Sequence, residues 1–139
     1  MKARREGNRI FIRLETGDEV HPSLVAIAER ERVAGGWLNG IGAATEVELG
    51  HYSIDRKDYD RVNVEGDVEV ASVSGTVGLV DGQPFVHLHA VVSDRQCVTR
   101  GGHLFRAITG ATLEFVLLVA EAPIERTPDE ATGLNLWRV

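Results

Sequence analysis

Three of the five histidines lie in two short segments of the chain and could bind a metal ion together. His87 and His89 lie in PFVHLHAVV, and His103 lies in RGGHLF. In a β-strand, residues i and i+2 point to the same face, with Cα atoms about 6.6 Å apart. Two such imidazoles can each place a nitrogen about 2.0–2.1 Å from one ion. The spacing therefore favours a metal site on one face of a strand.

His103 would supply the third ligand from the next strand. The segment 93–102 is typical of a turn, so the strand after it could pair antiparallel with residues 85–92 and bring His103 beside the other two. Gly101 and Gly102 have no side chains that would crowd the site. Three neutral imidazoles suit Zn²⁺, Ni²⁺, Cu²⁺ or Fe²⁺. We expect a divalent transition metal here, with zinc as the first choice.

The same spacing also allows histidines that only hydrogen-bond their neighbours. If a metal is bound, the site could be structural, could bind a small anion, or could activate a water molecule as in a hydrolase or lyase. No catalytic residue can be named, because Glu46, Glu48 and His51 are only distant candidates for a general base. The sequence contains no motif for an organic cofactor, and Cys97 is expected to be an idle thiol. Whether the protein is an enzyme stays open.

The elements that would position the histidines are mostly strands. Alternation of apolar and polar residues predicts a strand over 9–15, and Asp81-Gly82 predicts a hairpin turn. Further strands are expected over residues 36–41, 46–53, 59–64, 67–80, 84–92, 101–107, 112–120 and 134–137.

One helix is expected between the first two strands. Pro22 suits the first turn of a helix, and Leu24, Ile27 and Ala28 form an apolar stripe at helical spacing. The pair Gly35-Gly36 is expected to end it. These elements predict an α+β fold, a mostly antiparallel sheet of about 7–8 strands with one main helix packed on it. Residues 1–8 are expected to be a flexible N-terminus and residues 9–139 a single domain.

Composition limits the partners and the location. Acidic residues outnumber basic ones by 21 to 15, for a net charge of −6, which disfavours binding to nucleic acid through phosphates. A local basic patch from the arginines of residues 4–13 remains an alternative to a solvated terminus. The single cysteine fits a reducing compartment. No apolar segment is long enough for a secretory signal or a membrane span. We therefore expect a cytoplasmic protein without membrane contact.

Several longer segments resemble one known family. WLNGIGAATEVELGHY, EGDVEVASVSGTVGLVDGQPFVHLHAVVSD, RGGHLF and TGLNLW occur in the same order as the motifs of the plants-and-prokaryotes-conserved (PPC) domain. The resemblance runs from about Arg9 to Trp137. One departure is His51, where the family more often has tyrosine.

The resemblance implies properties that spacing alone does not. PPC domains are α+β and assemble as homotrimers, and prokaryotic members often carry a three-histidine set that matches His87, His89 and His103. Plant members follow AT-hook motifs in DNA-binding proteins, and prokaryotic relatives carry the label of predicted DNA-binding proteins. This chain has no Arg-Gly-Arg-Pro hook. We therefore expect a metal-binding homotrimer with a small-molecule or anion ligand, and we regard DNA binding as doubtful.

Overall fold

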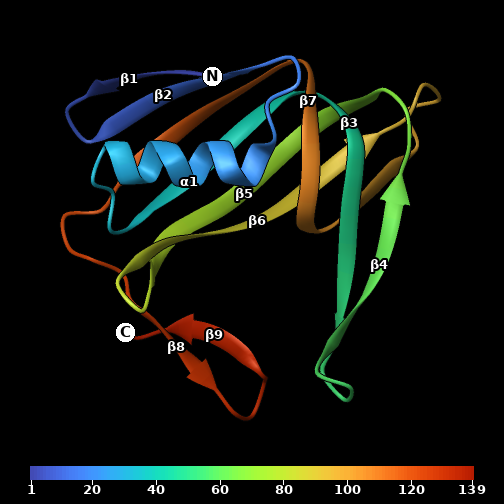
Figure 1. Ribbon diagram of the computed structural model, residues 1–139. Coiled ribbons are helices and arrows are strands. Elements are labelled where there is room, and N and C mark those ends of the chain that lie inside the picture. Colours follow the sequence, from blue (N-terminus) through green and yellow to red (C-terminus); the bar gives the residue numbers. More distant parts are fainter.

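Seven strands form one antiparallel sheet that closes on itself. The computed structural model describes residues 1–139, and the strands lie in the order β1-β2-β7-β6-β5-β3-β4 with an additional pairing between β7 and β3. The strands β3, β5, β6 and β7 therefore form a closed circuit. Figure 1 shows β1 and β2 at one end of the molecule and the β3–β4 hairpin at the other. The elements are β1 (Lys2–Glu6), β2 (Arg9–Glu15), α1 (Val20–Arg30), β3 (Gly36–Ser53), β4 (Asp58–Val64), β5 (Val68–Val80), β6 (Gln83–Ser93), β7 (Thr99–Val119), β8 (Arg126–Asp129) and β9 (Leu134–Trp137).

The expected α+β class is wrong, because the fold is β-rich. Strands contain 66% of the residues and the one helix contains 8%. In the sequence, Gly40–Gly42 and residues 108–111 resemble breaks between strands. They predict separate short strands on either side of each position. In the structure β3 and β7 continue through these positions as strands of 18 and 21 residues. A single helix beside nine strands covers part of one sheet and does not form a layer of its own.

Bulges in β3 explain how so long a strand fits a small sheet. Its pairing with β7 shifts register between Gly42 and Ala44, and twice more between Thr45 and Leu49. Bulges bend a strand and increase its twist. The first half of β3 therefore pairs with β5 and the end of β7, and its second half pairs with β4 and the start of β7.

The predicted helix is present as α1, although it ends earlier than expected. The helix stops at Arg30 and Arg32 takes a positive φ of 55°, whereas Gly36 already begins β3. With 11 residues, α1 is neither long nor apolar enough to cross a membrane. Its buried side chains are Val20, Ser23, Leu24, Ile27 and Ala28, which include the predicted stripe.

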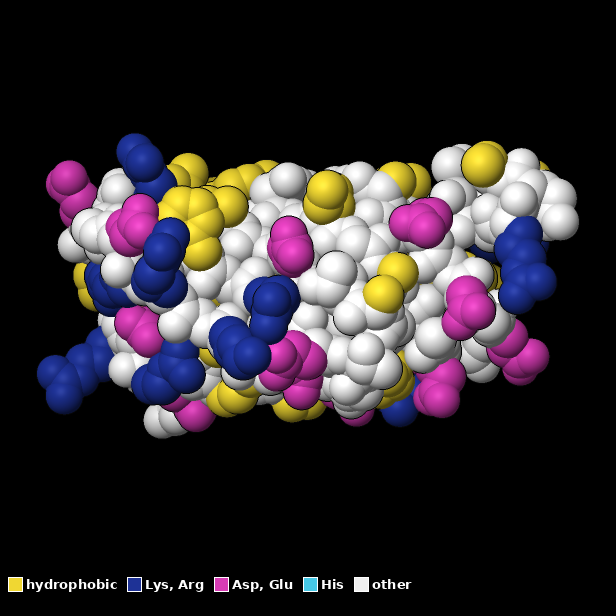
Figure 2. Space-filling model, turned by 90° about the horizontal axis from the view of Figure 1, so that it is seen from above, with side chains coloured by type: hydrophobic (Ala, Val, Ile, Leu, Met, Phe, Trp, Pro, Cys, Tyr) yellow, Lys and Arg dark blue, Asp and Glu magenta, His cyan; other side chains and the backbone are white.

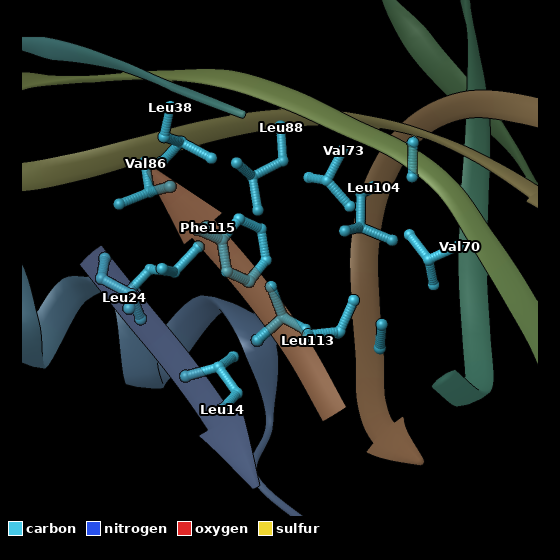
Figure 3. Packing of buried hydrophobic residues seen from close by; sticks show 14 of the residues in the cluster. Leu14, Leu24, Leu38, Val70, Val73, Val86, Leu88, Leu104, Leu113 and Phe115 are labelled. Carbon is cyan, nitrogen blue, oxygen red and sulfur yellow. The ribbon is translucent and has the colours of Figure 1, made fainter. Parts of the chain in front are cut away.

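The core lies between α1 and the inner face of the sheet. Figure 3 shows Leu24 of the helix facing side chains from several strands, among them Leu14, Leu88 and Phe115. Burying a side chain of this size contributes about 1.5–3 kcal/mol. The inward side chains of β6 alternate as predicted: Val86, Leu88, Ala90 and Val92 are all buried. The residues between them therefore project from the outer face of the sheet.

Both ends of the chain form strands. Where the sequence predicts a flexible N-terminus, β1 pairs along its whole length with β2. The segment Leu134–Trp137 is the strand β9, as predicted, and it pairs with β8 in a separate two-stranded sheet. The segment just before β8 is hydrogen-bonded to β5, because the Leu79 amide donates to the Ile124 carbonyl over 2.8 Å. This contact holds the small sheet beside β5.

Two glycines allow β7 to lie close to β3 where the circuit closes. A Cβ atom on Gly102 would lie 2.6 Å from the Gly50 carbonyl oxygen, closer than real Cβ atoms come to backbone. A Cβ atom on Gly50 would lie 2.5 Å from the Phe105 ring. A larger residue at position 102 would push the strands apart, and one at position 50 would displace the Phe105 ring. Gly102 directly precedes His103, so this approach also sets the position of that histidine.

We predict that Gly102→Ala lowers the free energy of unfolding by about 1–3 kcal/mol, because the methyl group overpacks the contact between β7 and β3. The matched control is Gly110→Ala on the same strand, where the nearest atom to the new Cβ would be 3.4 Å away. The control should change stability by no more than about 0.5 kcal/mol. Urea unfolding followed by circular dichroism measures both, and equal stabilities for the two variants would contradict the close approach.

Candidate metal centre

The structure brings His87, His89 and His103 together on the outer face of the sheet. His87 and His89 project outward from β6, because the residues between and beside them face the core. His103 lies on β7 directly opposite His89 in the antiparallel pairing. His89 is exposed, whereas His87 and His103 are half-buried. The cluster is therefore open to solvent on one side and held by two paired strands on the other.

The three imidazoles are close enough for their nitrogens to approach a common ion. Their ring centroids lie 5.2 Å apart for His87 and His89, 5.0 Å for His87 and His103, and 5.5 Å for His89 and His103. One potential ligand atom from each side chain lies within 4.8 Å of the others. In the tetrahedral geometry of zinc sites, two nitrogens that share one ion lie about 3.3–3.4 Å apart. Shared ligation therefore requires the rings to rotate toward one another.

The surroundings keep two of these histidines in the form that binds metal. Burial, followed by the positive charge of Arg126 and the proximity of His89, lowers the pKa of His87 to about 4. Burial, followed by the proximity of His87 and His89, lowers the pKa of His103 to about 4. Both rings are thus neutral near pH 7, with a lone pair available. The Nδ1 atom of His103 is buried and has no hydrogen-bond partner.

Aromatic rings cover the side of His103 that faces β3 and β4. Phe105 and Tyr59 lie 4.6 and 4.9 Å from the His103 ring, measured between centroids. They pack over Gly50, which leaves room for them on the outer face. Arg61 lies 3.8 Å from the Phe105 centroid and pairs with Glu48 over 3.1 Å. This wall limits how far the His103 ring can rotate.

The other side of the cluster contains Arg126, which sequence reasoning missed. Its guanidinium donates to the Thr76 hydroxyl and to the Asn135 carbonyl, each over 2.8 Å. Thr76 is the cross-strand neighbour of His87. Arg126 begins β8, some 40 residues after His87, and no periodicity in the sequence indicates that this hairpin returns to β5. Only the three-dimensional path of the chain could reveal it.

The remaining candidate residues lie outside the cluster. His21 is the second residue of α1, and burial lowers its pKa. His51 alternates along β3 with Gly50 and so projects from the opposite face of the strand. Glu46 forms an ion pair with Arg106 over 2.8 Å. Cys97 is a free, exposed thiol. None of these belongs to the group of potential metal ligands.

Three solved structures have closely similar folds. A metal-containing protein from Archaeoglobus fulgidus is 31% identical, with a TM-score of 0.88 over 96% of this chain and 94% of that one. A PPC protein from Pyrococcus horikoshii is 28% identical, with a TM-score of 0.88 over 99% and 94%. A candidate DNA-binding protein from Bacteroides thetaiotaomicron is 27% identical, with a TM-score of 0.94 over 99% and 96%.

Sequence comparison gives the family directly. No match was found among curated proteins. The family model of the Plants and Prokaryotes Conserved (PCC) domain matches residues 1–121, which include β1 to β7 and all three clustered histidines. This match agrees with the resemblance carried by the histidine and glycine motifs. The chain is a member of the PCC domain family.

Proposed function

We propose that this protein is a metal-binding domain in which His87, His89 and His103 hold one divalent transition metal ion, with zinc as the first choice. The observation that carries the proposal is the convergence of three imidazoles from two paired strands. The buried, unpartnered Nδ1 atom of His103 also fits a metal ligand. A relative with 31% identity is described as containing metal. Neutral nitrogen donors of this kind suit zinc better than magnesium or calcium, which prefer oxygen.

The surroundings favour ligand binding over hydrolysis or elimination. A zinc ion with three protein ligands supplies a fourth position that water or another small ligand can occupy. A hydrolase or lyase would in addition need a free general base near that position. Glu46 and Glu48 are engaged by Arg106 and Arg61, and His51 projects from the other face of β3. Neither Glu46 nor Glu48 therefore has a free carboxylate for proton transfer near the metal.

We predict that the purified wild-type protein contains about one transition metal ion per chain, measured by inductively coupled plasma mass spectrometry. The double variant His87→Ala/His89→Ala should contain almost none, because one remaining imidazole cannot hold the ion alone. His51→Ala is the matched control and should keep the full content. A double variant that folds and still binds one ion per chain would refute the site.

We also propose that the domain assembles as a homotrimer through an apolar face. This apolar face consists of exposed side chains on the outer side of β2, β3 and β7: Phe11, Trp37, Ile41, Val116 and Leu118. Trp37 and Ile41 are 50% and 60% exposed. Contiguous exposed apolar side chains of this size are typical of protein interfaces. Trp37 is also the cross-strand neighbour of Thr76, which pairs with His87, so an interface here would lie near the histidines.

The assembly is tested by light scattering coupled to size-exclusion chromatography. We expect the wild type to elute with about three times the chain mass of 15.2 kDa. Trp37→Asp should shift it toward a monomer, because the variant places a charge within the apolar face. Ile54→Asp, at a position in the β3–β4 turn that is 70% exposed and lies outside the apolar face, should leave the mass unchanged. A monomeric wild type would overturn the proposal.

DNA binding is the alternative function, and it is favoured by the description of structural relatives. Figure 2 shows basic side chains gathered at one end of one face, with acidic side chains among them. The ion pairs explain this mixture: Arg4 pairs with Glu6, and Lys2 and Arg13 both pair with Glu15. Glu6 and Glu15 therefore offset part of the positive charge of β1 and β2, and the chain as a whole has a net charge of −6.

We expect no shift of a 30-base-pair duplex below about 1 µM protein at physiological salt, because only weak non-specific binding is available to such a surface. Electrophoretic mobility shift at two salt concentrations measures this. Submicromolar binding that weakens steeply with salt would instead support the DNA-binding alternative.

A further inference from the structure

We propose that Arg126 forms a subsite for a small carboxylate or oxyanion beside the three histidines. The proposal rests on the metal site proposed above and names the class of ligand that this site takes. The anion would lie between the guanidinium and the metal-binding side chains, with its oxygens directed to both. Arg126 lies outside the residues 1–121 that match the family, so the family assignment does not include this subsite.

The position of Arg126 is fixed by contacts on the outer face of the sheet. Its Nη2 atom donates to the Thr76 hydroxyl over 2.8 Å, and Thr76 is the cross-strand neighbour of His87. Its guanidinium carbon lies 5.4 Å from the ring centroid of Phe85, which precedes His87 by two residues on the same face of β6. The positive charge therefore lies on the outer face of the sheet, at Thr76 and Phe85, the cross-strand neighbour and the same-face neighbour of His87.

Arg126 has a positive charge without a negative partner. It forms none of the ion pairs of the protein, although it is half-buried. Its two hydrogen bonds go to a neutral hydroxyl and a carbonyl, and its Nε atom has no partner. A guanidinium has five N–H donors, so donors remain for a ligand. A half-buried cation of this kind is stabilised when an anion binds beside it.

Arg61 provides a contrast on the opposite side of the cluster. It also stacks on an aromatic ring, with its guanidinium carbon 3.8 Å from the Phe105 centroid. Its charge, however, is already compensated by Glu48. Of the two arginines that flank the histidines, only Arg126 is thus free to attract an anion.

The chemistry of the groups around the proposed subsite selects the ligand class. Guanidinium groups bind carboxylates and phosphates through paired, charge-assisted hydrogen bonds. Three neutral imidazoles leave the full charge of a bound divalent ion uncompensated. Metal and arginine together would make the subsite strongly positive, which disfavours cations and attracts anions with at least two oxygens. Phe85 adds an apolar surface beside the guanidinium, which suits a short carbon chain between carboxylates.

The test is calorimetric titration of the zinc-loaded protein with malonate and, separately, with inorganic phosphate. We expect Arg126→Met to weaken binding of the better probe by about ten- to a hundredfold, the range of one or more charge-assisted hydrogen bonds. Its zinc content should remain at the wild-type level, since Arg126 is not a ligand. Arg61→Met is the matched control and should bind within about twofold of wild type. Equal affinities for wild type and Arg126→Met, or no binding of either probe, would overturn the subsite.

The design separates this proposal from the metal site. If the wild type takes up no metal, the metal proposal fails. The metal-free protein is then titrated with the same two anions. Binding that depends on Arg126 supports the subsite, and the absence of such binding refutes it. Should Arg126→Met not fold, as judged by circular dichroism, Arg126→Lys takes its place. Lysine keeps the charge but lacks the fork of paired donors, so unchanged affinity in that variant contradicts the proposed contact.

Discussion

The close approach of β7 to β3 is the constraint on which the rest of the structure depends. Because Gly102 has no side chain, its backbone lies near that of Gly50 at the point where β7 also pairs with β6. This contact closes the sheet around its core. It also places His103, the next residue, opposite His89. One steric requirement thus serves both the fold and the candidate site.

Because side chains alternate along β6, one face of the strand contributes to stability and the other carries the candidate metal ligands. Its inward residues are buried in the core against α1 and the other strands, whereas its outward residues include His87 and His89. The candidate metal centre therefore lies on the outside of the closed sheet. The buried inner face anchors β6 in the core, and the open outer face leaves room for a ligand. The C-terminal hairpin reaches the same surface and adds Arg126.

Local periodicity was enough to predict the histidine cluster, because i and i+2 residues of a strand share a face and a following antiparallel strand returns beside it. It was also enough for the helix stripe and for the Asp81-Gly82 turn, where both residues take positive φ. The fold class could not be predicted in this way, since a bulge such as that near Gly42 looks like a strand end in sequence. Arg126 was missed because its contact with Thr76 spans 50 residues.

The most direct test of the central claim is a crystal structure of the metal-loaded protein with an anomalous-difference map. We expect one strong peak per chain, about 2.0–2.1 Å from one nitrogen of each of His87, His89 and His103. A map with no peak among these three rings, in a crystal whose protein contains stoichiometric metal, would show that the ion is held elsewhere and would refute the three-histidine site.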